Sequence, residues 1–83
     1  MTNEEVFAKL SEILQTDFKV PAAKITPEAT FRGTLGLDSL DAVDLIYLVG
    51  KTFGIKAKVD SFADLHTVQQ VVSHVARVKS EAQ

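Results

Sequence analysis

The middle of the chain reads Leu35-Gly36-Leu37-Asp38-Ser39-Leu40-Asp41-Ala42-Val43-Asp44-Leu45, a stretch with the features of a helix start. Asp38 is a natural N-cap residue, because its side-chain oxygen can accept hydrogen bonds from the free N–H groups of the first turn. Asp41 falls at N3, where a carboxylate suits the positive end of the helix dipole. We therefore predict a helix that begins near Asp38 or Ser39, runs to about Phe53, and has Gly54 as its C′ residue.

This predicted helix is apolar on two opposite sides. At about 100° per residue from Leu40, Val43 and Tyr47 lie within about 60° of Leu40. A larger aliphatic set lies near the opposite side: Ala42, Leu45, Ile46, Val49 and Phe53. The larger set is the expected core face, which leaves Leu40, Val43 and Tyr47 as an exposed stripe edged by Asp44 and Lys51. Such a stripe is typical of a partner site. Alternatively, the preceding loop folds over the stripe and buries it.

Three further segments show helical periodicity: residues 3–18, a short segment at 60–65, and residues 67–79. Capping boxes are expected from Thr2 with Glu5 and from Thr67 with Gln70. The connection 19–37 is long, but apolar residues are spread through it, so we expect an ordered, packed loop. These residues are Ile25, Phe31, Leu35 and Leu37. The predicted fold class is a small all-α bundle of three main helices and a short one, in which residues 60–65 are either helix or loop.

The composition excludes several classes of protein. The chain has 83 residues, of which 46% are hydrophobic and 24% charged, so we expect a single domain, residues 1–83, with a modest core. A net charge of −2 makes nucleic acid a poor partner. The absence of cysteine excludes disulfides, thiolate metal sites and thiol nucleophiles. With no long apolar run and no signal-peptide pattern, we expect a cytoplasmic monomer without a membrane span.

Ser39 is the candidate functional residue at the start of the central helix. A helix N-terminus favours a phosphate ester, whereas Asp38 and Asp41 oppose it and would suit a divalent ion or a basic modifying enzyme. Taken alone, an Asp-Ser pair in this position is most often a cap. His66 and His74 have no carboxylate at ligand spacing, so no metal site is expected. No Gly-x-Ser-x-Gly motif surrounds Ser39, which speaks against a hydrolase.

The longer string from Phe31 through Leu35–Leu45 closely resembles the acyl carrier protein family. The resemblance covers nearly the whole chain, because the helix order and the Thr67-Val68 pair that opens the last helix also agree. It implies that Ser39 carries covalent 4′-phosphopantetheine, attached by a phosphopantetheinyl transferase with Mg²⁺, and that Asp38 helps to place this ion. A protein of this kind is not an enzyme, and its prosthetic arm supplies the thiol that the chain lacks.

The resemblance further implies two sets of residues and a function. The expected partner face is Leu40, Asp41, Val43, Asp44, Tyr47 and Lys51. The expected lining of an acyl cavity is Ala42, Leu45, Ile46, Val49, Phe53, Ala57, Phe62, Leu65 and Val71. The implied function is to carry acyl groups as thioesters to loading and processing enzymes with basic docking patches, in fatty acid, specialised lipid or polyketide biosynthesis. Two alternatives stay open: an aminoacyl or peptidyl carrier, and a helical interaction module without a prosthetic group.

The charges depart from the pattern of carriers in bulk fatty acid synthesis, which continue the helix with glutamates. Residues 38–44 hold three acids and no base, whereas residues 51–58 hold three bases and no acid. This split indicates a specialised carrier with dedicated partners. Phe62 is expected either to narrow the acyl cavity or to fill the space beside Ala57. Lys24 and Arg32, in the long loop, are expected to be solvated.

Overall fold

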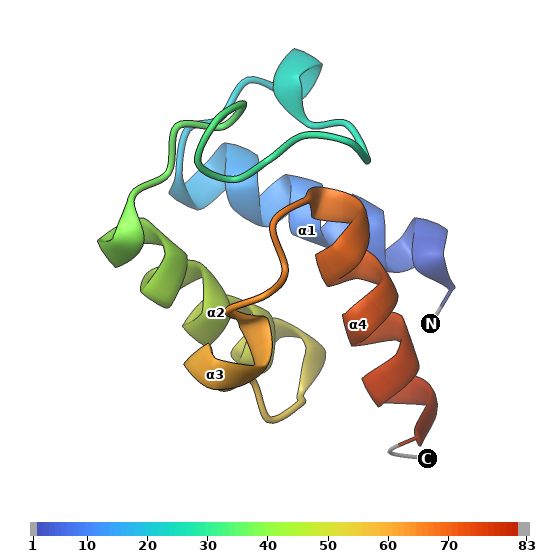
Figure 1. Ribbon diagram of the computed structural model, residues 1–83. Helices are drawn as coiled ribbons and strands as arrows, with labels where there is room; N and C mark the ends of the chain where they lie inside the picture. Colours follow the sequence, from blue (N-terminus) through green and yellow to red (C-terminus); the bar gives the residue numbers. More distant parts are fainter. Residues whose placement is uncertain (1, 82–83) are drawn as a thin grey trace.

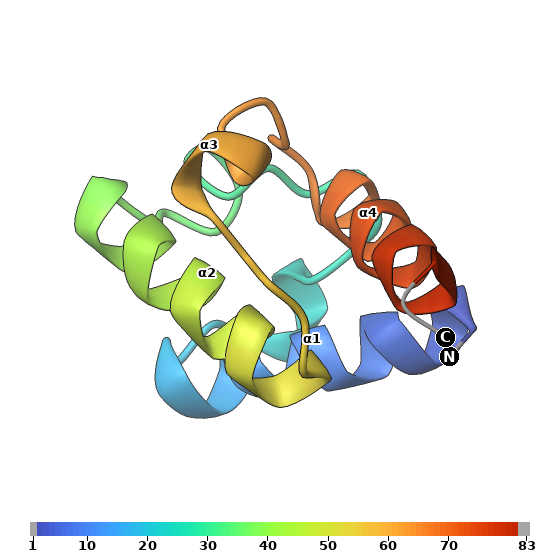
Figure 2. The same ribbon diagram turned by 90° about the horizontal axis from the view of Figure 1, so that it is seen from below.

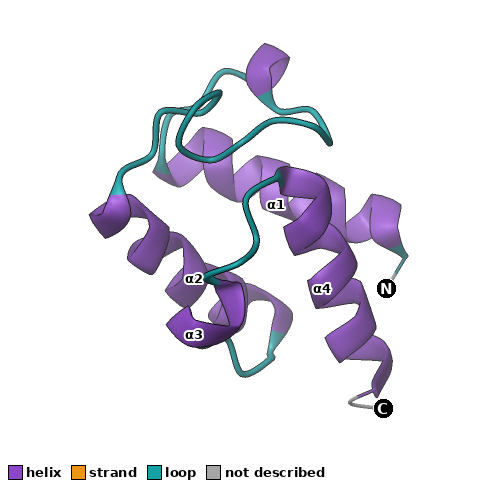
Figure 3. Cartoon of the chain, viewed as in Figure 1, coloured by secondary structure: helices purple, strands orange, loops and turns teal. Residues whose placement is uncertain are grey.

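The computed structural model describes residues 2–81, which form a helical bundle (Figures 1 and 3). The elements are α1 (Asn3–Asp17), η1 (Ala22–Lys24), α2 (Ser39–Phe53), α3 (Val59–Phe62) and α4 (Val68–Glu81). Within residues 2–81 there is no strand, only an isolated antiparallel bridge between Thr30 and Thr67. The predicted all-α class, with three long helices and a short one, is confirmed. No helix in this part of the chain is long and apolar enough to cross a membrane.

The predicted capping boxes are both present. Thr2 Oγ1 accepts from the Glu5 backbone N–H at 3.1 Å, and Thr67 Oγ1 accepts from that of Gln70 at 3.2 Å. In return, the Thr67 N–H donates to Gln70 Oε1 at 3.0 Å. The Thr2 backbone N–H donates to Glu5 Oε1 at 2.9 Å and lowers the pKa of the Glu5 carboxyl below its ordinary value. Local hydrogen bonding thus fixes where α1 and α4 begin.

The helix ends differ slightly from the predictions. Phe18 is not the last residue of α1 but its C-cap, because the chain reverses at Lys19, which has φ of 56°. The short helix α3 covers residues 59–62 instead of 60–65, and α4 extends two residues beyond Lys79. Helix α2 ends at Phe53 as predicted, and the left-handed φ of 66° at Gly54 explains why glycine follows it.

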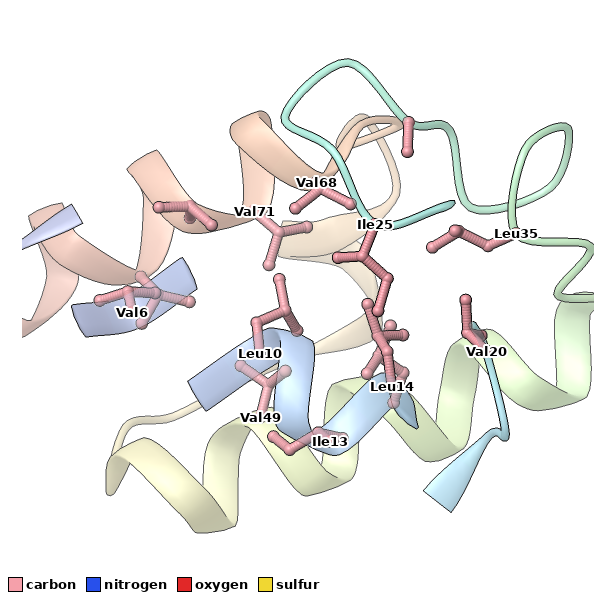
Figure 4. Packing of buried hydrophobic residues seen from close by; sticks show 14 of the residues in the cluster. Val6, Leu10, Ile13, Leu14, Val20, Ile25, Leu35, Val49, Val68 and Val71 are labelled. Carbon is pink, nitrogen blue, oxygen red and sulfur yellow. The ribbon is translucent and has the colours of Figure 1, made fainter. Parts of the chain in front are cut away.

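The core is one cluster of buried aliphatic and aromatic side chains between the helices. Helices α1 and α4 pack against each other, and α3 lies beside α2 on the side of the bundle toward α4 (Figures 1 and 2). Figure 4 shows Leu10 of α1, Val49 of α2 and Val71 of α4 pointing toward one another. The buried helical residues are Val6, Leu10, Ile13, Leu14, Leu45, Val49, Phe53, Phe62, Val68, Val71, Val72 and Val75. The predicted core face of α2 is therefore the buried one.

The long loop before α2 is ordered and packed, as predicted. Its buried residues are Val20, Ile25, Ala29, Leu35 and Leu37. Backbone hydrogen bonds fasten it to the start of α4: Val68 N donates to Ala29 O at 3.0 Å, and Gln69 N donates to Pro27 O at 2.9 Å. The loop therefore closes the end of the bundle at which α2 and α4 both begin.

A pair of leucine variants tests the assignment of core and surface. Leu10 is fully buried, so Leu10→Ala should lower the free energy of unfolding by about 2–5 kcal/mol. Leu40 is 77% exposed, and Leu40→Ala should change it by no more than about 0.5 kcal/mol. Urea unfolding followed by circular dichroism measures both values. Equal losses for the two variants would contradict the packing.

Candidate functional site

Ser39 is the first residue of α2 and lies exposed where the long loop enters the helix. Its Oγ accepts a hydrogen bond from Arg32 Nη2 at 2.7 Å. Arg32 is exposed, as expected, and the loop in addition turns its guanidinium toward Ser39. Lys24, in η1, is exposed as expected.

The aspartates on either side of Ser39 close the start of α2. Asp38 Oδ1 accepts from the Asp41 backbone N–H at 2.9 Å, and Asp41 Oδ2 accepts from that of Asp38 at 3.3 Å. The N-cap was predicted, whereas the return bond from Asp41 was not, because the usual residue at N3 of a capping box is Glu or Gln. Each carboxylate has two oxygens, so a capping role for Asp38 leaves it able to approach a second partner.

An apolar cleft of about 610 Å³ lies between the loop, α2, α3 and the start of α4. Seven residues of the expected acyl cavity line it: Ala42, Leu45, Ile46, Val49, Phe62, Leu65 and Val71. Further lining residues were not predicted: Thr30, Phe31, Arg32, Gly33, Ser39, Val43, Val59, Ala63 and His66. Because Ser39 and Arg32 are both exposed and both line the cleft, they belong to its rim.

Two residues expected in the cavity are not in this cleft. Phe53 is buried in the core cluster, because it lies a full turn beyond Val49 toward the C-terminal end of α2. Ala57 packs on Gly50, where an added Cβ would stand 3.1 Å from the Ala57 Cβ. Phe62 forms part of the cleft wall. Its ring packs edge to face on that of His74, with 5.1 Å between the two ring centroids.

The predicted stripe on α2 is not covered by the loop. Leu40, Val43 and Tyr47 are 77%, 48% and 67% exposed. Val59 of α3 adds a further apolar side chain, 51% exposed, which the prediction missed because it placed the start of the short helix one residue later. An uncovered row of large apolar side chains suits contact with another protein.

The charged residues of the predicted face separate along α2. Asp41 and Asp44 lie in its first half, while Lys51 lies in its last turn and exposed Lys56 and Lys58 follow. Within residues 2–81, no group of three or more His, Cys, Asp or Glu side chains could hold a metal ion. His66 is exposed at the cleft, and His74 Nδ1 lies 3.1 Å from Arg77 Nη2.

Arg32 lies at the candidate site, and sequence reasoning did not single it out. The one available signal is that no other lysine or arginine occurs between Lys24 and Lys51, a span that contains four acids. That signal marks an isolated cation but gives no direction for its side chain. The direction comes from the fold of the loop, which no local pattern specifies.

Comparisons with known proteins indicate one family for the chain. The family described as phosphopantetheine attachment site matches residues 8–75. An acyl carrier protein of Thermobifida fusca (strain YX) is 34% identical over 76 residues, which cover 92% of this chain and 96% of the relative. An acyl carrier protein of Onion yellows phytoplasma (strain OY-M) is 36% identical over 72 residues, which cover 87% of this chain and 95% of the relative. Acyl carrier protein 2 of Ralstonia nicotianae (strain ATCC BAA-1114 / GMI1000) is 36% identical over 75 residues, or 90% and 93% of the two chains.

The capping box makes a prediction for Asp38. Asp38→Ala should lower the free energy of unfolding by about 1 kcal/mol, because the first turn of α2 loses the acceptor for Asp41 N. Asp38→Asn keeps an acceptor oxygen, so it should lower the free energy of unfolding by only about a few tenths of a kcal/mol. Asp44→Ala, at an exposed position on the same helix, is the matched control with a change within about 0.5 kcal/mol. Thermal or urea unfolding measures all three, and an Asp38→Ala value equal to the control would contradict the box.

Proposed function

Because this chain belongs to the acyl carrier protein family, whose members have a phosphopantetheine attachment site, we propose that Ser39 is the residue that carries 4′-phosphopantetheine. The protein is a carrier and not a catalyst. The observation that supports Ser39 is its position: an exposed hydroxyl at the first residue of α2, on the rim of the apolar cleft. Residues 1–83 act as one carrier domain in this proposal, in keeping with the family match over residues 8–75.

The residues around Ser39 fit a phosphodiester. The start of a helix carries unpaired backbone N–H groups and the positive end of the dipole, both of which favour an anion. The guanidinium of Arg32 already contacts the Ser39 oxygen that would form the ester. When bound, the arm supplies a terminal thiol for thioester formation, and this chain contains no cysteine of its own.

Loading replaces the proton on Ser39 Oγ by the phosphoryl end of the arm, and the nucleotide portion of coenzyme A leaves. A phosphopantetheinyl transferase with Mg²⁺ is the partner for this step. Asp38 is suited to help place the ion, because its second carboxylate oxygen can point outward while Oδ1 caps α2. The exposure of Ser39 gives such an enzyme access to the hydroxyl.

The lining of the cleft supports an aliphatic acyl chain as cargo. Its walls include Leu45, Ile46, Val49, Phe62 and Val71, all apolar. Each methylene buried there would stabilise the loaded protein by up to about 0.8 kcal/mol. A charged amino group would lose hydration against the same walls without a compensating partner, so the aminoacyl alternative has less support.

The exposed stripe of α2 is the proposed contact surface for loading and processing enzymes. Leu40, Val43 and Tyr47 supply apolar area, and Asp41 and Asp44 would attract a basic docking patch. Lys51 would repel a patch that is basic along its whole length. We therefore propose a specialised carrier whose partners are basic toward Ser39 and acidic or neutral toward the end of α2.

Intact mass spectrometry tests the attachment site. After incubation with coenzyme A, Mg²⁺ and a broad-specificity phosphopantetheinyl transferase, the wild type should gain the mass of one phosphopantetheine. Ser39→Ala should gain nothing, and Ser80→Ala, at an exposed serine in the last turn of α4, should load like the wild type. A folded wild-type chain that several transferases leave unmodified would indicate an interaction module instead. Loading of Ser39→Ala would place the arm elsewhere.

The partner face is tested by Val43→Asp. Val43 is half exposed, so the protein should stay folded, with the helical circular dichroism spectrum of the wild type. The initial rate of phosphopantetheine transfer should fall about tenfold, because a carboxylate replaces an apolar contact. Ala8→Asp, at an exposed position of α1, is the control and should load at the wild-type rate. A wild-type rate for Val43→Asp would contradict the face, and loss of helicity would mean that the stripe is core.

A further inference from the structure

Arg32 lies beside the atom to which the prosthetic arm is proposed to bond. Its Nη2 donates to Ser39 Oγ at 2.7 Å, a short bond for a nitrogen donor. Both residues line the cleft. In the unloaded protein, the guanidinium therefore holds the hydroxyl at the rim.

The loop around Arg32 is built to keep the residue in place. Thr30 and Thr34 exchange hydrogen bonds, in which each backbone N–H donates to the hydroxyl of the other residue at 3.1 Å. Between them, a Cβ added to Gly33 would lie 2.7 Å from Thr30 Oγ1, so the turn is too tight for a larger residue. The short separation between the two threonines fixes the chain just before and just after Arg32.

Phe31 ties this turn to His66 at the cleft and to the segment that leads into α2. Its backbone N–H donates to His66 O at 3.1 Å, and its carbonyl accepts from Leu37 N at 2.8 Å. Leu37 stands two residues before Ser39 in the sequence. The distance between the Arg32 backbone and the start of α2 is therefore set by main-chain bonds and not by the side chains alone.

A cation beside Ser39 would offset the negative charges that gather there when the arm is attached. A phosphodiester adds a negative charge next to Asp38 and Asp41, whose carboxylates are held in the capping box. Like charges at such separations repel. Arg32 is the one lysine or arginine between residues 25 and 50, so it is the residue of this segment that can offset the added charge.

We propose that Arg32 binds the phosphodiester at the root of the prosthetic arm and acts as a positioning residue for that arm. This inference rests on the proposed attachment at Ser39. On loading, Oγ becomes an ester oxygen, and the non-bridging oxygens on the adjoining phosphorus are better acceptors for the same guanidinium. An arginine suits the role because its planar fork of donors matches a phosphate and stays charged at all physiological pH values.

As a consequence, the end of the arm that is attached to Ser39 is held on the side of the rim formed by the loop. Arg32 lines the cleft, so its hold on the phosphate keeps the start of the arm beside the cleft opening. Without Arg32, the same arm would be attached equally well but would sample more directions.

Nuclear magnetic resonance of fully loaded protein tests the contact. Wild type, Arg32→Lys, Arg32→Gln and Lys24→Gln are loaded with the transferase, and intact mass confirms one arm on each. The ³¹P resonance should move in Arg32→Gln, move less in Arg32→Lys, and stay in place in Lys24→Gln, which removes an exposed loop cation. In wild type, loading should slow the exchange of the Arg32 guanidinium hydrogens with water and shift the guanidinium resonances. Added NaCl should reduce both effects.

A thermal measurement gives a second readout. The quantity compared is the holo Tm minus the apo Tm of each protein. In Arg32→Gln this difference should be roughly 2–6 °C lower than in the wild type. Loaded Arg32→Gln with an unchanged ³¹P resonance and an unchanged holo-minus-apo Tm would overturn the role of Arg32 while leaving Ser39 as the attachment site. Failure of wild-type Ser39 to load would overturn both proposals. Should Arg32→Gln fold poorly, the comparison between wild type and Arg32→Lys decides in the same way.

Discussion

Main-chain hydrogen bonds between the long loop and the start of α4 hold the functional end of the molecule together. They link Pro27, Ala29 and Phe31 to residues 66–69, and two of them form the bridge that pairs Thr30 with Thr67. Main-chain bonds of this kind tolerate little displacement, so the loop cannot drift away from α4 while they persist. One wall of the cleft, the turn that carries Arg32 and the approach to Ser39 all depend on these few contacts.

Helix α2 has two roles that place opposite demands on its surface. Leu45, Val49 and Phe53 anchor it in the core, while Leu40 and Tyr47 remain in solvent at the cost of exposed apolar area. In a small domain with a modest core, this exposure lowers the stability that the same residues could have provided. The proposed docking of partner enzymes on this stripe would cover that exposed area.

Local patterns predicted the helices well, because the forces that set them act within a few residues. The bonds of Thr2 with Glu5 and of Thr67 with Gln70 could be predicted from spacing alone. The two faces of α2 followed from the helical period. The contact of Arg32 with Ser39 could not be predicted, because it depends on the path of an irregular loop. Phe53 and Ala57 were expected in the cavity from the resemblance alone, and neither lines the cleft: Phe53 lies in the core cluster, and Ala57 lies in the segment between α2 and α3.

The exposed position of Tyr47 has an optical consequence. The chain contains one tyrosine and no tryptophan, so its near-ultraviolet fluorescence comes from a single ring on the proposed contact face. That ring is 67% exposed in the free protein, and any surface that covers the stripe would change its solvation. The carrier therefore contains an intrinsic reporter of docking that needs no label. With a partner that contains neither tryptophan nor tyrosine, its emission could follow each encounter in real time.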